Sequence, residues 1–236
     1  MWNRSDLKYA AKDHMKKNYW PCVAVAFIYT IIQLMTLGGS GGGRGVSSNN
    51  TDSFAENSVI SYMMDYVMDH PMIILGIVGV GIVGFIIGLV IKLLVGYQIE
   101  VGVKGFFVRN TYTEPRVGEI LATYHNGSIG TVALTRFLMD LFTTLWMLLL
   151  IIPGIVKSYQ YKMIPYILAD NPDIEWREAF DLSKQMTDGH KMDLFILDLS
   201  FIGWYILSGI TCGLAGIFYV VPYKEQTMAE AYETLR

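Results

Sequence analysis

Residues 72–95 read MIILGIVGVGIVGFIIGLVIKLLV, and Lys92 is the only charged residue among them. A helix of about 20 apolar residues spans the roughly 30 Å hydrocarbon core of a bilayer. Three further apolar runs occupy residues 21–37, 131–152 and 194–221. The whole composition agrees, because 53% of the 236 residues are hydrophobic and 17% are charged, against about 25% charged in soluble domains. The sequence therefore predicts an all-α, polytopic bundle of transmembrane helices in contact with the lipid bilayer.

The same composition argues against several functional classes. The net charge is −3 and no basic stripe with interleaved aromatic residues is present, so nucleic acid is not an expected partner. Cys22 and Cys212 lie in apolar runs without metal-binding spacing. They are expected to be buried as small hydrophobic residues, with a disulfide between them left open. The stretch LGGSGGGRGVSSNNTDS, residues 37–53, lacks the GK[ST] of a phosphate-binding loop and is expected to be a flexible outer linker.

Neither a metal nor a cofactor is expected. The four histidines lie far apart in the sequence, at His14, His70, His125 and His190. Two metal readings stay open. One is a cytoplasmic site between the first and last of these histidines. The other is a Cu(I) site in SYMMDYVMDHPM, residues 61–72, because thioethers suit that ion. An amphipathic approach to the following span explains the methionines more simply.

The basic N-terminal segment, residues 1–19, precedes the first apolar run. A cleaved signal peptide is one reading of this arrangement. The segment is long, however, and Leu7, Ala11 and Met15 recur at i, i+4 and i+8. This spacing favours a cytoplasmic amphipathic helix followed by an uncleaved first span.

The positions of Lys and Arg predict the orientation of the chain in the membrane. They gather in the N-terminal segment, in residues 98–130, in residues 165–191 and in the tail, whereas the loop 38–70 holds only Arg44. Positive residues mark cytoplasmic loops, so both termini are placed in the cytoplasm of a plasma-membrane protein and residues 38–70 outside. The chain must then cross back after residues 131–152, with a turn at Pro153-Gly154.

This reasoning gives one integral membrane domain, residues 1–236, with six membrane segments. The segments are residues 20–37, 72–97, 131–152, 154–169, 192–210 and 214–223. The last two segments are joined by a turn at residues 211–213. In a four-span alternative, residues 131–168 form one long kinked helix and residues 165–191 lie outside.

The most polar stretch is PYILADNPDIEWREAFDLSKQMTDGHK, residues 165–191. Asn171-Pro172 suits a helix start and Gly189 suits a C′ position. Trp176, Phe180 and Met186 recur at helical spacing, which predicts an interfacial amphipathic helix over residues 170–190 with its charges in water. A partner-docking surface and an acid–base site are the weaker alternatives.

Small residues in the second apolar run predict a helix contact. Gly81, Gly84 and Gly88 include a small-xxx-small spacing that lets helix backbones approach closely. The contact is expected within the bundle or in a homodimer.

Ionisable residues at membrane depth are the main functional candidates, because charges in lipid are costly and need partners. Arg136, Asp140 and Asp198 fall inside predicted spans, and Lys157 and Lys162 fall in the predicted return helix. We expect an Arg136–Asp198 or an Arg136–Asp140 pair. Such a pair would either join two helices or line a polar substrate path.

Four stretches together carry a family resemblance. They are LKYAAKDHMKKNYW (7–20), IIPGIVKSYQYKMIPYILADNP (151–172), EAFDLSKQMTDGHKMDLFILDLSFIGW (178–204) and PYKEQTMAEAYETLR (222–236). In order and spacing, the chain resembles the bacterial domain-of-unknown-function family 975 of multi-pass integral membrane proteins. That family is distantly similar to Yip-type membrane proteins and to the membrane domain of glycerophosphodiester phosphodiesterases. The resemblance implies a bacterial plasma membrane and no established activity.

The leading functional hypothesis is a non-catalytic membrane scaffold or an accessory to transport or envelope functions, with another membrane protein as a partner. The alternative is a small secondary transporter or permease component that uses Arg136, Asp140 and Asp198. A lipid-modifying enzyme is the weakest reading, because no paired catalytic constellation is present.

Overall fold

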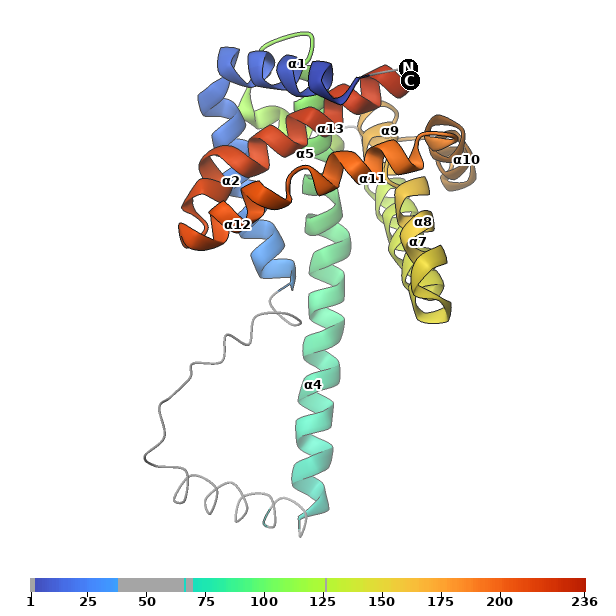
Figure 1. The fold of residues 1–236 in the computed structure, drawn as a ribbon. Coiled ribbons are helices and arrows are strands. Elements are labelled where there is room, and N and C mark those ends of the chain that lie inside the picture. The colour runs from blue at the N-terminus through green and yellow to red at the C-terminus, as the bar shows by residue number, and fades with distance from the viewer. Residues whose placement is uncertain (1–2, 38–65, 67–69, 126) are drawn as a thin grey trace. The chain divides into compact units, whose positions relative to one another are not determined.

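The computed structural model describes residues 3–37, 66, 70–125 and 127–236, and its regular elements in these residues are all helices (Figure 1). The α-helices are α1 (Arg4–Lys17), α2 (Tyr19–Leu37), α4 (Pro71–Ile91), α5 (Tyr97–Arg109), α6 (Ala122–His125), α7 (Ile129–Leu149), α8 (Ile151–Gln160), α9 (Ile164–Asp170), α10 (Trp176–Thr187), α11 (Lys191–Leu199), α12 (Ile202–Ile210) and α13 (Val221–Leu235). The described residues also form the π-helices η1 (Lys92–Gly96) and η3 (Gly216–Val220) and the 3-10 helix η2 (Val117–Leu121). The all-α prediction is confirmed.

Three helices among the described residues are long and apolar enough to cross a membrane. They are Val78–Arg109, Ile129–Leu149 and Lys191–Ile210, and Tyr19–Gln33 is a shorter apolar helix. These three helices overlap the predicted second, third and fifth segments. The six-segment topology goes beyond them and stays a prediction.

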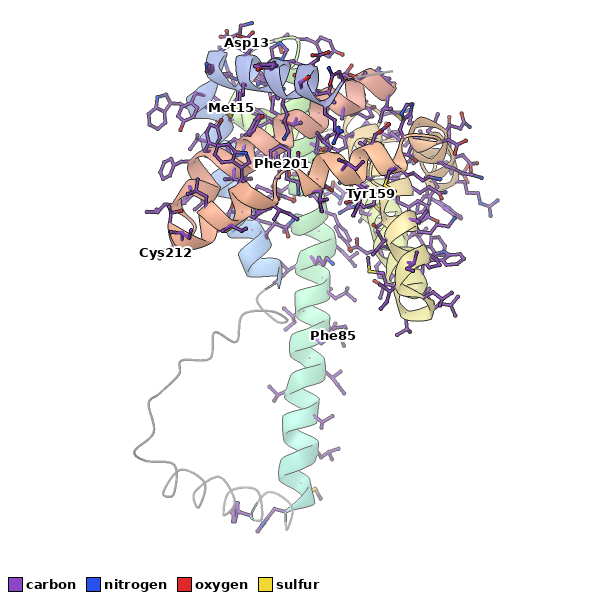
Figure 2. All side chains as sticks on the ribbon, in the orientation of Figure 1. Asp13, Met15, Phe85, Tyr159, Phe201 and Cys212 are labelled. Atoms are coloured by element: carbon purple, nitrogen blue, oxygen red, sulfur yellow. The ribbon has the colours of Figure 1, made fainter. Side chains whose placement is uncertain are left out.

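The chain divides into two compact units, and the smaller one, Thr36–Lys92, contains α4. Pro71 is the first residue of α4. A backbone N–H at this position would have no hydrogen-bond partner within the helix, so proline is tolerated there. Side chains such as Phe85 project from the helix (Figure 2). A Cβ added at Gly81, Gly84 or Gly88 would meet no described atom within 4 Å, so their helix contact stays a prediction. The structure does not describe residues 38–53 of the predicted linker. It also does not describe Met63, Met64 and Met68 of the alternative Cu(I) site.

Helix α5 lies at the centre of the larger unit, which comprises Met1–Met35 and Leu93–Arg236. It contacts α7, α9, α13 and η2, and Val101, Phe106 and Phe107 are fully buried. The sequence predicted that the second membrane segment ends at residue 97 and that residues 98–130 form a loop. A loop over residues 98–109 is wrong, because α5 continues to Arg109, whereas the membrane boundary at residue 97 stays a prediction. The charged residues of α5 lower the local hydropathy, but the fold supplies partners for them.

Helices α7 and α8 form a hairpin that reverses at Leu150, whose backbone is extended (Figure 1). The predicted turn at Pro153-Gly154 is therefore wrong by a few residues. Pro153 sits in the first turn of α8, where a missing N–H is tolerated. A Cβ on Gly154 would lie 2.6 Å from Met147 Cγ, so this glycine permits the close approach of the two helices. The hairpin also excludes one long kinked helix over residues 131–168.

The second predicted turn, at residues 211–213, is confirmed. Cys212 and Gly213 have φ of 52° and 89°, and the Gly213 N–H donates to Ser208 O at 2.8 Å. The preceding run, Lys191–Ile210, is interrupted by a hydrogen-bonded turn at residues 200–201. Cys212 is exposed (Figure 2) and Cys22 is buried, and both thiols are free. The expected burial is therefore confirmed for Cys22 and wrong for Cys212, and the pairing that the sequence left open does not occur.

Helix α10 carries the predicted amphipathic face but starts later than predicted. Its N-cap is Glu175, whereas Asn171 is the C-cap of α9, with its N–H donating to Ile167 O at 2.8 Å. Pro172 disfavours helical backbone at the residue before it, so α9 ends there. Gly189, with φ of 75°, follows the C-cap as predicted.

The apolar face of α10 packs on protein. The Phe180 ring meets Phe142 and Tyr161 edge-on, with centroids 5.8 and 4.9 Å away. Trp176 and Met186, on the same helix, are half-buried. A membrane-interface position for α10 stays a prediction.

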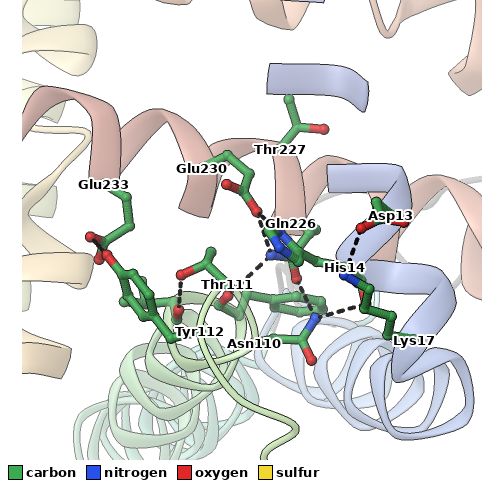
Figure 3. Close-up of polar contacts among 12 residues, drawn as sticks. Asp13, His14, Lys17, Asn110, Thr111, Tyr112, Gln226, Thr227, Glu230 and Glu233 are labelled. Carbon is green, nitrogen blue, oxygen red and sulfur yellow. Dashed lines mark hydrogen bonds and ion pairs between the residues drawn. The ribbon is translucent and has the colours of Figure 1, made fainter. Parts of the chain in front are cut away.

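The two ends of the chain pack together through α1 and α13. Leu7, Ala11 and Met15 are buried, which is the face that the sequence predicted. A polar chain joins both helices to the end of α5 (Figure 3). Asn110 accepts from Asn18 at 2.9 Å and donates to Gln226 at 2.8 Å. Beyond it, Gln226 donates to Glu230 at 3.1 Å, and Glu230 contacts His14 Nδ1 at 2.6 Å. The tail is therefore an integral part of the fold.

Candidate functional site

A cavity of about 350 Å³ lies among the helices of the larger unit. Its walls come from α2, α5, α7, α8, α9, α11 and α13 and from the turn between α8 and α9. The charged residues that line it are Lys104, Arg136, Lys162, Lys224, Glu100, Asp198 and Glu225. Three tyrosines also line it, at Tyr29, Tyr159 and Tyr166. A charged cavity among apolar helices is the feature most suited to binding a ligand.

An ion pair between α5 and α7 forms one wall. Arg136 Nη2 lies 2.6 Å from Glu100 Oε2, and the two side chains are 6% and 17% exposed. The guanidinium also lies over the Tyr97 ring, at 5.4 Å from its centroid. Among the described residues, Arg136 Nε is buried without a hydrogen-bond partner. The ion pair with Glu100 is therefore the contact that balances this buried cation.

A second ion pair joins α5 to α13. Lys104 Nζ lies 2.5 Å from Glu225 Oε2, and the two side chains are 12% and 10% exposed. The ammonium group also faces the rings of Tyr29 and Tyr166, at 5.6 and 5.3 Å from their centroids. Such buried charges need close partners, and this pair supplies them.

Asp198 on α11 is shared by two lysines. It forms an ion pair with Lys162, and Lys224 Nζ lies 3.7 Å from its other oxygen. The Tyr159 hydroxyl donates to Asp198 at 2.9 Å. Lys224 also donates to the Tyr205 hydroxyl at 2.8 Å. Burial alone would lower the pKa of Lys224, but the Asp198 charge and this hydrogen bond hold the pKa above its ordinary value. Lys224 is therefore a cation at neutral pH.

Three of the five predicted intramembrane residues meet at the cavity, namely Arg136, Lys162 and Asp198. Asp140 accepts from the Tyr97 hydroxyl at 2.7 Å, and its charge also acts on Arg136. Lys157 donates to Gln160 at 3.2 Å and lies over the Trp146 ring. Neither of these two residues belongs to the described lining.

The predicted Arg136–Asp198 pair is wrong, because each residue has a nearer partner. Arg136 pairs with Glu100, and Asp198 pairs with Lys162 and Lys224. Glu100 was not predicted as a site residue, because residues 98–130 were expected to form a loop. The i, i+4 spacing of Glu100 and Lys104 on an apolar helix could have indicated them.

The metal readings gain no support from the described residues. His14 is engaged by Glu230, and His190 lies 3.4 Å from Asp193. No group of three or more His, Cys, Asp and Glu side chains that could hold a metal ion occurs in the part of the chain that the structure describes.

The fold and the site together define an all-α protein with candidate membrane helices and a charged cavity among them. Residues 117–236 match the family described as "Protein of unknown function (DUF975)". The chain belongs to this family, which confirms the resemblance seen in the sequence. A search of curated proteins and a search of solved structures each found no match. The family description assigns no activity, so the site has to be interpreted from its own chemistry.

Proposed function

We propose that the protein is a non-enzymatic, multi-pass protein of the bacterial plasma membrane that binds a charged ligand in this cavity, as a secondary transporter or permease component. The cavity itself is the observation that carries the proposal. Ion pairs that served only to join helices would be expected to close on each other. Here they surround about 350 Å³ of open space.

The pairing of the acids supports a non-enzymatic role. Glu100 pairs with Arg136, Glu225 with Lys104, and Asp198 with Lys162. A carboxylate held by a cation is a weak general base, because the cation stabilises its ionised form. The cavity is therefore better suited to holding a charge than to moving a proton.

The transport role can be tested with Asp198→Asn. The two lysines that lose their partner, Lys162 and Lys224, are 23% and 27% exposed, so water can solvate them and the variant should fold. Loss of the charge pattern should then reduce flux by about tenfold or more. The assay uses proteoliposomes with radiolabelled phosphate, acetate or glutamate, and a fluorescent phosphatidylglycerol to detect lipid movement across the bilayer.

The control for this test is Asp181→Asn, which alters an exposed carboxylate on α10. It should leave the flux of every probe unchanged. Two outcomes would favour the scaffold role instead. In the first, Asp198→Asn unfolds the protein. In the second, the variant folds, but neither it nor the unaltered protein moves any probe differently from protein-free liposomes.

We further propose the six-segment topology with both termini in the cytoplasm. Two reversals support it, the α7–α8 hairpin and the turn at residues 211–213. In a Cys212→Ser background, Glu178→Cys on α10 should react with a membrane-impermeant maleimide only after cells are permeabilised. Ser47→Cys, in the predicted outer loop, should react in intact cells. Reaction of Glu178→Cys in intact cells would overturn the topology.

A further inference from the structure

A second, apolar pocket lies next to the charged cavity. It has a volume of about 290 Å³ and lies between α8 and α11. Five apolar side chains line it, from Ile152, Ile155, Val156, Met192 and Phe195. The remaining lining comes from Tyr159 and Lys191. Ile152 and Met192 are 77% and 66% exposed, so this apolar groove is open at the protein surface.

Tyr159, which is labelled in Figure 2, lines both the charged cavity and the apolar groove. Its ring packs edge-on against Phe195 in the groove, with centroids 5.7 Å apart. Its hydroxyl donates to Asp198 in the cavity, at 2.9 Å. Tyr159 thus has its ring among the apolar side chains of the groove and its hydroxyl among the charges of the cavity. A ligand with a polar head and an apolar chain would match this arrangement.

The charged side chains that line the cavity indicate whether the polar headgroup of the ligand is negative or positive. Four basic and three acidic side chains occur among the described residues that line it. The lining by itself therefore carries a net formal charge of +1. A single negative charge on a ligand would balance the lining.

We propose that the cavity and the groove together bind a phospholipid whose headgroup is a monoanionic phosphodiester, with the headgroup in the cavity and an acyl chain along the groove. This inference rests on the proposed ligand-binding function and names its ligand class. The balance of charge favours a monoanion over a zwitterionic headgroup. The groove gives a lipid an additional site that a free phosphate compound would leave empty.

The test measures binding of a fluorescent phosphatidylglycerol to the full-length protein in a non-ionic detergent. Unlabelled phosphatidylglycerol should compete. Phosphatidylcholine with the same acyl chains should compete about tenfold less well, because its head has no net charge. Soluble glycerol 3-phosphate, which lacks an acyl chain, should also compete at least about tenfold less well.

Two matched substitutions test whether the acyl chain binds in the groove. Val156→Glu places a carboxylate in the groove and should weaken phosphatidylglycerol binding by about tenfold or more. Ile210→Glu changes an equally apolar, exposed residue of α12 outside the groove and should leave binding unchanged. If Val156→Glu fails to fold, the lipid competition measured on the unaltered protein still tests the lipid proposal.

Equal competition by phosphatidylcholine would indicate non-specific lipid contact and overturn the lipid proposal. Preferred binding of glycerol 3-phosphate would overturn it as well, while leaving a charged-ligand function in place. If no anion competes and flux is also insensitive to Asp198→Asn, the proposed function fails together with this inference. The outcomes therefore separate the two claims.

Discussion

Replacing Glu100 with alanine is expected to lower the free energy of unfolding by about 3–5 kcal/mol. Its partner Arg136 lies at 2.6 Å and is 6% exposed. The variant would leave a guanidinium cation buried without its counter-charge, and this costs more than the intact pair contributes. Unfolding can be followed in detergent with a thiol-reactive dye in a Cys212→Ser background, because the remaining Cys22 is buried in the native state.

Two further variants make the Glu100 prediction specific. Asp13→Ala removes an ion pair of similar length with Lys17, whose side chains are 63% and 56% exposed (Figure 3). It should leave the unfolding midpoint unchanged, since exposed pairs contribute little. The double variant Glu100→Leu/Arg136→Met should recover most of the lost stability, because an apolar pair of similar volume can replace a buried ion pair. Equal effects of Asp13→Ala and Glu100→Ala would contradict the buried-pair interpretation.

Gly102→Ala should destabilise the protein, although alanine is the better helix former. A Cβ at this position on α5 would overlap the Ile120 carbonyl oxygen of η2 and lie 2.7 Å from its carbonyl carbon. The obstacle is backbone, which cannot rotate away as a side chain can. We expect a loss of about 3 kcal/mol, the upper part of the range for overpacking, measured by the same reaction of Cys22.

The control for Gly102→Ala has the opposite expected sign. Gly203 lies in α12, where an added Cβ would meet no described atom within 4 Å. Gly203→Ala should therefore stabilise the protein slightly, by about 0.5–1 kcal/mol, because alanine loses less backbone entropy in a helix. If Gly102→Ala also stabilised the protein, the close contact between α5 and η2 would be disproved.

Local sequence patterns predicted much of the secondary structure. Hydropathy identified the three long apolar helices, because each is apolar over enough consecutive residues to be recognised without its neighbours. The i, i+4 spacing of Leu7, Ala11 and Met15 identified the buried face of α1. Turn chemistry placed Gly189 and residues 211–213 correctly. Asn171 was misplaced because an Asn-Pro pair fits both the end of one helix and the start of the next.

The candidate site was predictable only in part. Arg136, Lys162 and Asp198 stood out as charges in apolar surroundings, and the structure places all three at the cavity. Their partners did not stand out. Glu100 and Lys104 interrupt the hydropathy of α5, and Glu225 lies in a tail that looked polar. Each is held by a residue distant in the sequence, at Arg136, Glu225 and Lys104 respectively.

The sequence by itself determined that this is a helical protein with membrane-length apolar segments, because hydrophobic length and helical period are properties of consecutive residues. It also determined the family. Only the tertiary structure decided that α5 is central, that the chain reverses at Leu150 and which acid pairs with which base. Ion-pair partners are set by distances between helices, and no local pattern encodes those distances. For the same reason, the contact of Tyr159 with both the charged cavity and the apolar groove became visible only once α8 and α11 were packed together.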